Sequence, residues 1–464
     1  MTDSGDAYGR GPLARLRDLL SRRRSRGETV DAATLRVQLQ ILQEAFEAAG
    51  DRVGVARHRD GGLGYLYHPT RALVRADDVG AVEEFFERSV VHQGRGRPET
   101  VIDGELVAYH FPPRGDGRVA LLEDLDALDE QVGAGVATPD HVLYVVAKTG
   151  KVCPAIEPRL PTSPQPVPHV NPDARAGRGV RVSVVDTGWY PPAARHEATR
   201  WLASGVEGDE EKLKTKGRTT VIHEYAGHGT FVAGVVKCLA PATDVEVEGF
   251  LTKGGAIWES EIAEQLHQAM LDYEDDPATP DFDPTPPDVI SISAGTHTHK
   301  KRPLLGFQVL GAIFRWDQNE TGPLIVAAAG NDSSSDKFWP AAFDWVVGVG
   351  ALDADGTRSD FSNFGDWVDV WAHGRDLVNA FPRGEYTYVE PASGQLCGTT
   401  QTFDGLARWS GTSFATPVVS GAIAAYMSDQ GVSARDARDA LIDHAHIVQD
   451  PKLGQLKALG PPFV

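Results

Sequence analysis

A serine at the start of an apolar helix is the first residue in this chain that could serve as a nucleophile. Ser413 stands in Arg-Trp-Ser-Gly-Thr-Ser-Phe-Ala-Thr-Pro, residues 408–417, and the apolar residues 415–426 predict a helix. The unpaired N–H groups and the positive dipole end of a helix N-terminus stabilise negative charge that develops nearby. Ser413 could therefore attack a carbonyl carbon, although most serines and threonines at such positions only cap a buried helix.

A serine hydroxyl is a poor nucleophile without a base to take its proton and a carboxylate to orient that base. The base candidate is His228, which lies between glycines at the start of a predicted helix, residues 227–236. The carboxylate candidate is Asp186, at the C-terminal end of a predicted buried parallel strand within residues 180–188. Catalytic groups of open α/β sheets gather at that edge. A lone aspartate there is usually a turn former, and a lone histidine in a helix is usually structural. The three residues together favour a catalytic triad.

These three segments resemble those of the subtilisin-like serine proteases. The shared motifs are Asp-Thr-Gly at a strand end, His-Gly-Thr at one helix start and Gly-Thr-Ser-x-Ala-Thr-Pro at another. The order Asp, His, Ser is also that of subtilisin. The resemblance implies an α/β fold, a mainly parallel sheet with helices on both faces. It also implies a serine endopeptidase that forms an acyl-enzyme on Ser413, with His228 as general base and acid and Asp186 orienting it. No metal or organic cofactor takes part in that chemistry.

Two further strand ends match the same family. Residues 324–329 form a continuous apolar run that ends in Gly-Asn, and the amide of Asn331 would stabilise the oxyanion of a tetrahedral intermediate. The alternative role is an asparagine that closes the strand in a turn. The apolar run 288–292 leads into Ser293, Ala294 and Gly295, which the resemblance implies as substrate-binding residues. An extended peptide would pair with them through main-chain hydrogen bonds.

The global composition excludes several other classes of protein. The chain has 464 residues, 41% hydrophobic and 24% charged, which is ordinary for a globular protein of about two domains. A formal net charge of -20 argues against nucleic acid or an anionic membrane as the main partner. The resemblance to the subtilisin-like proteases implies a protein or peptide substrate. The three cysteines, at positions 153, 238 and 397, form neither a disulfide framework nor a metal-ligand pattern, although a single pair stays open.

The N-terminus lacks the apolar core of a signal peptide, and no stretch approaches the ~20 apolar residues of a membrane span. We therefore expect a cytoplasmic protein, unlike the usual secreted members of the family. Four segments are predicted: a disordered basic tail (1–30), an N-terminal α+β domain (31–150), a proline-rich linker (151–176) and the catalytic domain (177–464).

Within the N-terminal domain, the pattern predicts helices over residues 35–50, 79–88 and 119–131. Predicted strands cover residues 63–74, broken by Pro69, then 105–111 and 142–146. This order suits a ferredoxin-like α+β unit. Many subtilisin-like proteases carry a prodomain of this kind, so intramolecular inhibition is one expectation. The alternatives are a recognition domain that stays attached, or a domain that binds a regulator.

Prolines between residues 156 and 172 favour an extended linker, where self-cleavage would be easiest, or else an ordered arm along the catalytic domain. Insertions are predicted at residues 208–218, 275–287 and 385–406. The first is acidic and could supply oxygen ligands to structural calcium, but no spacing requires it. For His297 and His299 the sequence favours exposed loop positions, with a place along the cleft as the alternative. Two rival functions remain, a silent pseudo-protease that binds peptides or partners and a dedicated processing protease for one intracellular partner.

Overall fold

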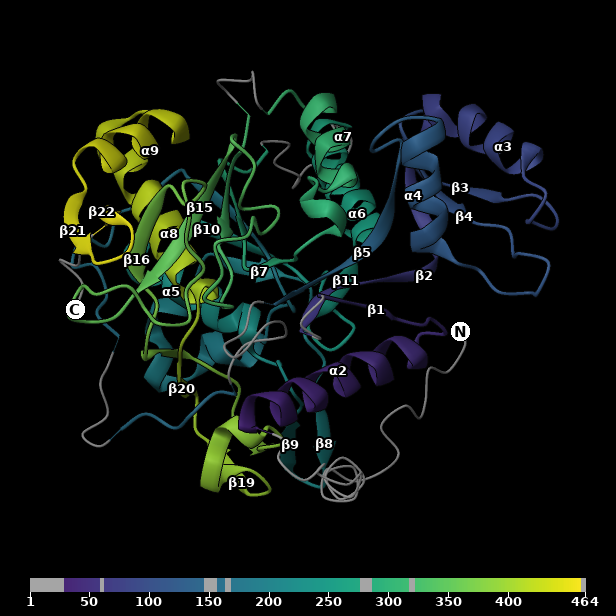
Figure 1. Cartoon of the computed structure of the whole chain (residues 1–464). Helices are drawn as coiled ribbons and strands as arrows, with labels where there is room; N and C mark the ends of the chain where they lie inside the picture. Colours follow the sequence, from purple (N-terminus) through teal and green to yellow (C-terminus); the bar gives the residue numbers. More distant parts are fainter. Residues whose placement is uncertain are drawn as a thin grey trace.

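The computed structural model describes residues 29–58, 62–145, 157–162, 168–275, 286–316 and 322–459. Almost all of the predicted basic tail lies outside these residues, as do Cys153 and most of the predicted insertion 275–287. The described chain forms two α/β units in contact, an N-terminal one and a larger one that carries the candidate triad (Figure 1).

The larger unit is built on a nine-stranded sheet with the order β21-β22-β16-β15-β14-β12-β6-β10-β7. Its strands, in chain order, are β6 Arg181–Val185, β7 Val206–Gly208, β10 Asp244–Glu248, β12 Val289–Ile292, β14 Leu324–Ala328, β15 Val346–Leu352, β16 Val370–His373, β21 His446–Asp450 and β22 Gly454–Ala458. Neighbours from β7 to β22 run parallel, and β21 is antiparallel to β22. The central strands are continuous buried apolar runs because both faces of a parallel sheet are covered.

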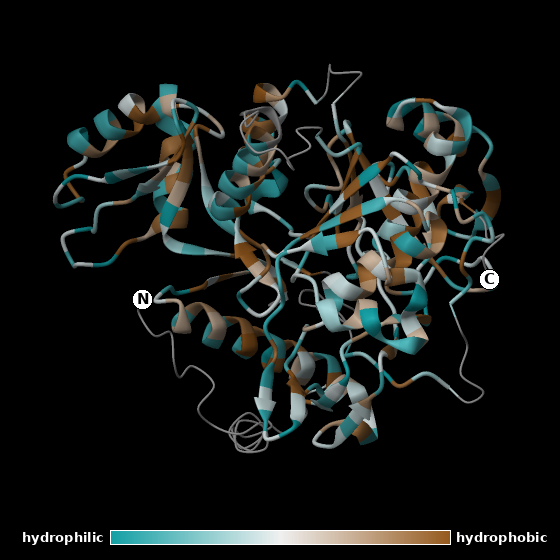
Figure 2. Cartoon of the chain, turned by 180° about the vertical axis from the view of Figure 1, so that it is seen from behind, coloured by the Kyte–Doolittle hydropathy of each residue, from teal (hydrophilic) through white to brown (hydrophobic). Residues whose placement is uncertain are grey.

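Helices cover the two faces of this sheet. One face packs against α5 (His228–Leu239) and α8 (Thr412–Gln430) in an apolar cluster that includes Val182 and Val326. The other faces α6 (Glu259–Asp275) and α7 (Leu305–Ile313). Helix α9 (Ala434–Asp443) packs on α8. In the rear view of Figure 2, the central strands carry long hydrophobic runs while the helices alternate hydrophobic and hydrophilic residues. The predicted fold class is confirmed.

The N-terminal unit is a second sheet with the order β11-β5-β2-β4-β3. Its own elements are β1 Gly54–Arg57, β2 Leu63–Arg75, α3 Val79–Arg88, β3 Arg97–Ile102, β4 Leu106–His110, α4 Leu121–Gln131 and β5 Ala137–Val145. From β2 onward this is the β-α-β-β-α-β order of a ferredoxin-like unit. The sequence missed β1 and β3. The predicted break at Pro69 is wrong, because β2 continues through this residue. The pairing of β2 with β5 shifts register between Tyr67 and Ala72, so the sheet needs no N–H donor at position 69.

The first described helix, α2 (Val30–Ala48), lies on the side of the N-terminal strands opposite α4 and reaches the larger unit (Figure 1). Val37 and Ile41 pack on Tyr225 and Val389. The Gln38 side chain donates a hydrogen bond to Glu390 at 2.9 Å. The helix therefore joins the two units.

Two predicted insertions, 208–218 and 385–406, contribute strands to one small sheet, in which a strand just outside the first insertion links them. The strands β8 (Lys214–Lys216), β9 (Thr219–Ile222), β18 (Gly384–Thr387) and β19 (Thr400–Phe403) form one small sheet. The strands β17 (Leu377–Ala380) and β20 (Leu406–Trp409) form another. In the described part of the linker, Arg159 bridges to Arg408 of β20, so residues 157–162 pack along the larger unit as an ordered arm.

Candidate active site

The predicted aspartate and histidine meet at the C-terminal edge of the large sheet. Asp186 follows β6 directly, and its carboxylate accepts from Nδ1 of His228 at 2.8 Å and 2.9 Å. Both side chains are fully buried. The Asp186 carboxylate also accepts from the backbone N–H of Thr187 at 2.7 Å. A carboxylate bound at Nδ1 fixes the imidazole so that Nε2 is left as the basic atom.

Two glycines let the histidine helix approach the strand end this closely. Gly227 precedes α5 with φ 81°, a left-handed conformation that side chains avoid, and a Cβ there would collide with Pro382. A Cβ at Gly229 would collide with the carbonyl of Gly188 and lie 3.2 Å from Cβ of Asp186. The glycines on either side of His228 are therefore requirements of packing.

Ser413 lies in the first turn of α8 and is fully buried. Its hydroxyl donates to the carbonyl of Ser293 at 3.2 Å, and the Ser293 hydroxyl donates back to the carbonyl of Ser413 at 3.0 Å. The predicted nucleophile is thus joined to the first predicted substrate-binding residue. The following residue, Phe414, packs its ring 5.0 Å from the ring of His228. Helix α8 therefore brings Ser413 to the histidine's side of the sheet edge.

Asn331 lies just beyond β14 with its amide held in one orientation. Its Oδ1 accepts from the backbone N–H of Thr412 at 2.8 Å and from the Thr412 hydroxyl at 3.0 Å. Its Nδ2 is buried and has no hydrogen-bond partner in the described protein. The same holds for Nε2 of His228. Leaving a buried polar atom unpaired costs ~1–3 kcal/mol, so two such atoms at one sheet edge suit a site that receives polar substrate atoms.

The predicted substrate strand is occupied by the chain itself. Ala294 and Gly295 form β13, which pairs antiparallel with Val145 and Tyr144 of β5. On its other side, β5 pairs antiparallel with β11 (Ala256–Trp258). The last residues of the N-terminal unit therefore form the middle strand between two strands of the larger unit.

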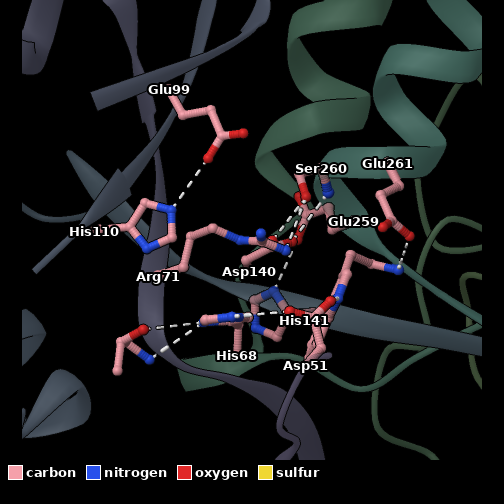
Figure 3. A network of polar contacts seen from close by, with 12 residues as sticks. Asp51, His68, Arg71, Glu99, His110, Asp140, His141, Glu259, Ser260 and Glu261 are labelled. Carbon is pink, nitrogen blue, oxygen red and sulfur yellow. Dashed lines mark hydrogen bonds and ion pairs between the residues drawn. The ribbon is translucent and has the colours of Figure 1, made fainter. Parts of the chain in front are cut away.

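A buried polar network holds β5 in place (Figure 3). Asp140 accepts from the Ser260 backbone N–H at 3.0 Å, at the start of α6, and from the Arg71 guanidinium at 2.7 Å. The next residue, His141, contacts Glu259 through Nδ1 at 2.8 Å. Burial raises the pKa of Glu259, whereas its bond to His141 lowers it. Docking of the N-terminal unit thus rests on directed polar contacts as well as on strand pairing.

The prediction that His297 and His299 are exposed is wrong. The exposed fractions of their side chains are 13% and 12%. His297 lies 3.3 Å from the carboxylate of Asp332, next to Asn331, and His299 bonds the Tyr65 hydroxyl at 2.6 Å. Both lie in the segment after β13. His299 packs against Tyr65 and His141 of the N-terminal unit, whereas His297 packs against Phe338 of the larger unit. The sequence could not predict this burial, because it does not show which distant residues cover the loop.

Two residues at the site were missed by sequence reasoning. Phe338 is fully buried, and its ring fills the space beside Gly295 and Gly330. Glu211, in the acidic predicted insertion 208–218, is buried and accepts from the N–H of Gly227 at 2.7 Å. For Glu211 the sequence carries no signal, since three acidic residues stand in a row and only the fold buries one of them.

Among the described residues, no cluster of three or more His, Cys, Asp or Glu side chains could hold a metal ion. Of the described helices, none combines the length and apolar character needed to cross a bilayer.

Known proteins resemble this chain over part of its length. The intracellular serine protease of Paenibacillus polymyxa is 30% identical over 266 residues, covering 53% of this chain and 66% of that protein. The thermophilic serine proteinase of Bacillus sp. (strain AK1) is 31% identical over 283 residues, covering 58% of this chain and 56% of that protein. The chain thus spans just over half to two thirds of the length of these relatives.

Among solved structures, a cold-adapted subtilisin-like serine proteinase aligns with a TM-score of 0.44 at 23% identity, covering 61% of this chain and 89% of that one. The family model described as the subtilase family matches residues 177–460, which is more than half of the chain. The chain therefore belongs to the subtilase family.

Proposed function

We propose that this protein is a serine endopeptidase that cleaves proteins or peptides through an acyl-enzyme on Ser413. The observation that carries the proposal is the buried Asp186–His228 hydrogen bond, at the sheet edge where Ser413 meets the substrate strand. A peptide-binding module would need the strand but not the oriented imidazole. That difference favours an enzyme over a silent pseudo-protease.

In the proposed mechanism, His228 takes the Ser413 proton as the hydroxyl attacks the scissile carbonyl. Asp186 holds the imidazole and stabilises the imidazolium that forms. The Nδ2 group of Asn331 and the backbone N–H of Ser413 bind the oxyanion. His228 then gives its proton to the leaving amine, and water hydrolyses the acyl-enzyme with His228 again as base. These steps need no metal or organic cofactor.

A fluorophosphonate probe tests this proposal, because it phosphonylates a serine only where a base activates the hydroxyl. We expect labelling of Ser413, located by mass spectrometry of the tryptic peptides, and its loss in His228→Ala. Absence of label from folded wild type and also from the folded Val145→Pro variant described below would favour the pseudo-protease. Digestion of a mixture of unstructured proteins separates a broad endopeptidase from a processing enzyme for one partner.

We also propose that β5 inhibits the enzyme by lying where a substrate would lie. Its pairing with β13 and β11 supports this, because a substrate strand would use the same hydrogen-bonding groups. The N–H of Val145 donates to the carbonyl of Gly255 at 2.8 Å. Inhibition within the chain is therefore by occupation of the cleft.

Replacing Val145 by proline removes that N–H and is expected to raise the peptidase activity of the full chain by about tenfold or more. The measurement is the initial rate on a fluorogenic peptide. Val145→Ala keeps the N–H and is the matched control, with activity expected near that of the wild type. A proline variant that is folded, as judged by its thermal melt, but no more active than wild type would contradict inhibition by β5.

Phe338 is proposed to restrict the residue on the acyl side of the cleaved bond to small side chains. A bound substrate would set its scissile carbonyl beside Ser413 and Asn331, so the adjacent side chain would face the space that Phe338 fills next to Gly295 and Gly330. A pocket already filled by a buried ring admits alanine or valine but not another ring.

Phe338→Ala is expected to raise kcat/KM for a substrate with phenylalanine at that position, relative to alanine, by at least about tenfold. Peptides that differ only there provide the measurement. Phe307→Ala, which also removes a fully buried ring from the same apolar cluster, is the control and should leave the ratio unchanged. An unchanged ratio in folded Phe338→Ala would rule the restriction out.

A cytoplasmic location stays a prediction from the sequence. The name of one relative, the intracellular serine protease of Paenibacillus polymyxa, is compatible with it. We likewise propose that the N-terminal unit is removed by self-cleavage. The four segment boundaries predicted from the sequence also stay predictions. Comparing the intact masses of wild type and Ser413→Ala tests the cleavage directly.

A further inference from the structure

A second carboxylate lies beside the candidate triad and takes no part in the mechanism above. Glu211 stands three residues beyond β7 and is 8% exposed. Its Oε2 accepts from the backbone N–H of Gly227, the residue before His228, at 2.7 Å. Its side chain also bonds that of Thr187, the residue after Asp186. One carboxyl group thus contacts the residue before His228, through its backbone N–H, and the residue after Asp186, through its side chain.

The backbone of Glu211 is held by the turn that follows Asp186. Its N–H donates to the carbonyl of Trp189 at 2.7 Å, and the neighbouring residue, Glu210, bridges to Trp189. A Cβ at Gly188 would lie 3.3 Å from Cβ of Glu211, so the loop packs directly on the turn that follows Asp186. The side chain therefore has little freedom to leave its two partners.

We propose that Glu211 is a positioning residue that holds Asp186 and His228 together and, when it ionises, places a second negative charge beside the imidazolium of the transition state. This inference rests on the proposed function, because it concerns the base of that reaction. Glu211 lies outside the sequence motifs that this chain shares with the family.

Several charged groups surround Glu211 and bear on its ionisation. The carboxylates are Asp186 at the end of β6, Asp209 and Glu210 on its own loop, and Glu224 on the turn before α5. The groups that can be cationic are Lys212 on the loop, Lys214 and Lys216 on β8, His223 on the turn and His228 on α5. Burial, with a smaller contribution from the charge of Asp186, raises the pKa of Glu211 to about 8, although the bond from Gly227 opposes the rise.

The pH dependence follows from these contacts. Below about pH 8 the side chain is neutral, and above it the side chain carries a negative charge. His228 becomes positive in the transition state, so a nearby anion stabilises that state more than the ground state. The rate should therefore rise in a second step as the pH passes through about 8, by about three- to tenfold.

Two substitutions separate the two roles. Glu211→Gln keeps an oxygen acceptor for the N–H of Gly227 but cannot ionise. It should keep the kcat of the wild type at pH 7 and lose the alkaline step. Glu211→Leu removes the acceptor as well, and it should lower kcat by about tenfold or more at every pH with little change in KM. Glu210→Gln, an exposed neighbour, is the matched control: it should keep the alkaline step, moved at most to a slightly lower pH because one neighbouring negative charge is removed.

The measurement is kcat and KM for one peptide from pH 6 to 10, with a thermal melt of each variant. Identical profiles for wild type and Glu211→Gln would overturn the electrostatic role. A kcat for folded Glu211→Leu equal to that of the wild type would overturn the positioning role. If Glu211→Leu fails to fold, Glu211→Gln alone decides: retained kcat with a lost step supports the proposal, and any other profile contradicts it. No hydrolysis by any protein, wild type included, would instead contradict the proposed function.

Discussion

Replacing Ser413 by alanine is expected to lower kcat by about a millionfold, a magnitude known for subtilisin itself rather than calculated from this chain. The reason is that no other group described at the site can form the acyl-enzyme. Ser413 lies at the start of α8 and against Ser293 of the substrate strand. The measurement is single-turnover hydrolysis of a peptide ester, in which even a slow residual rate is detectable.

The fold should survive this substitution. Alanine removes the hydrogen bond from the Ser413 hydroxyl to the carbonyl of Ser293, and such a bond is worth ~1 kcal/mol. Ser420→Ala is the matched control on the same helix, since its buried hydroxyl donates to the carbonyl of Thr416 and can accept from the Ser291 hydroxyl. It should cost similar stability but leave kcat within about tenfold. If the two variants kept similar activity, the nucleophile would have to be another residue.

The positions of the candidate site residues could be predicted from the sequence because each lies at a strand or helix end that a local pattern marks. Apolar runs mark the strands β6 and β14, and Asp186 and Asn331 stand just beyond their ends. Glycines mark the two helix starts at which His228 and Ser413 stand. Because a parallel sheet brings the C-terminal ends of its strands to one edge, these residues can be expected to lie near one another. The hydrogen bond between Asp186 and His228 follows from that placement.

What the sequence did not predict depends on contacts between distant segments. The insertion of β5 between β11 and β13 joins Tyr144 to Gly295, and nothing in the sequence near either residue indicates it. The burial of Glu211 and of His297 has the same origin, because each is covered by a segment that folds back from elsewhere. Polar residues in loops give the same pattern whether they are solvated or enclosed, so only the three-dimensional structure separates the two cases.

Replacing Asn331 by leucine is expected to lower kcat by about 10²–10³-fold with little change in KM, the range known for subtilisin's own oxyanion asparagine. Leucine has nearly the same shape but no N–H to bind the oxyanion. The donor in question is the buried Nδ2, which has no partner in the described part of the protein. Because the donor acts on charge that exists only in the transition state, substrate binding should be spared.

A loss of this size could also arise from movement of Ser413, because Oδ1 of Asn331 accepts from the N–H of Thr412, the residue before it. Asn331→Asp separates the two explanations: it keeps the acceptor for Thr412 but replaces the donor with an anion that repels the oxyanion. If Asn331 stabilises the oxyanion, Asn331→Asp should be at least as slow as Asn331→Leu. If Asn331 only holds the first turn of α8, Asn331→Asp should keep most of the wild-type kcat, and the oxyanion role would have to be given up.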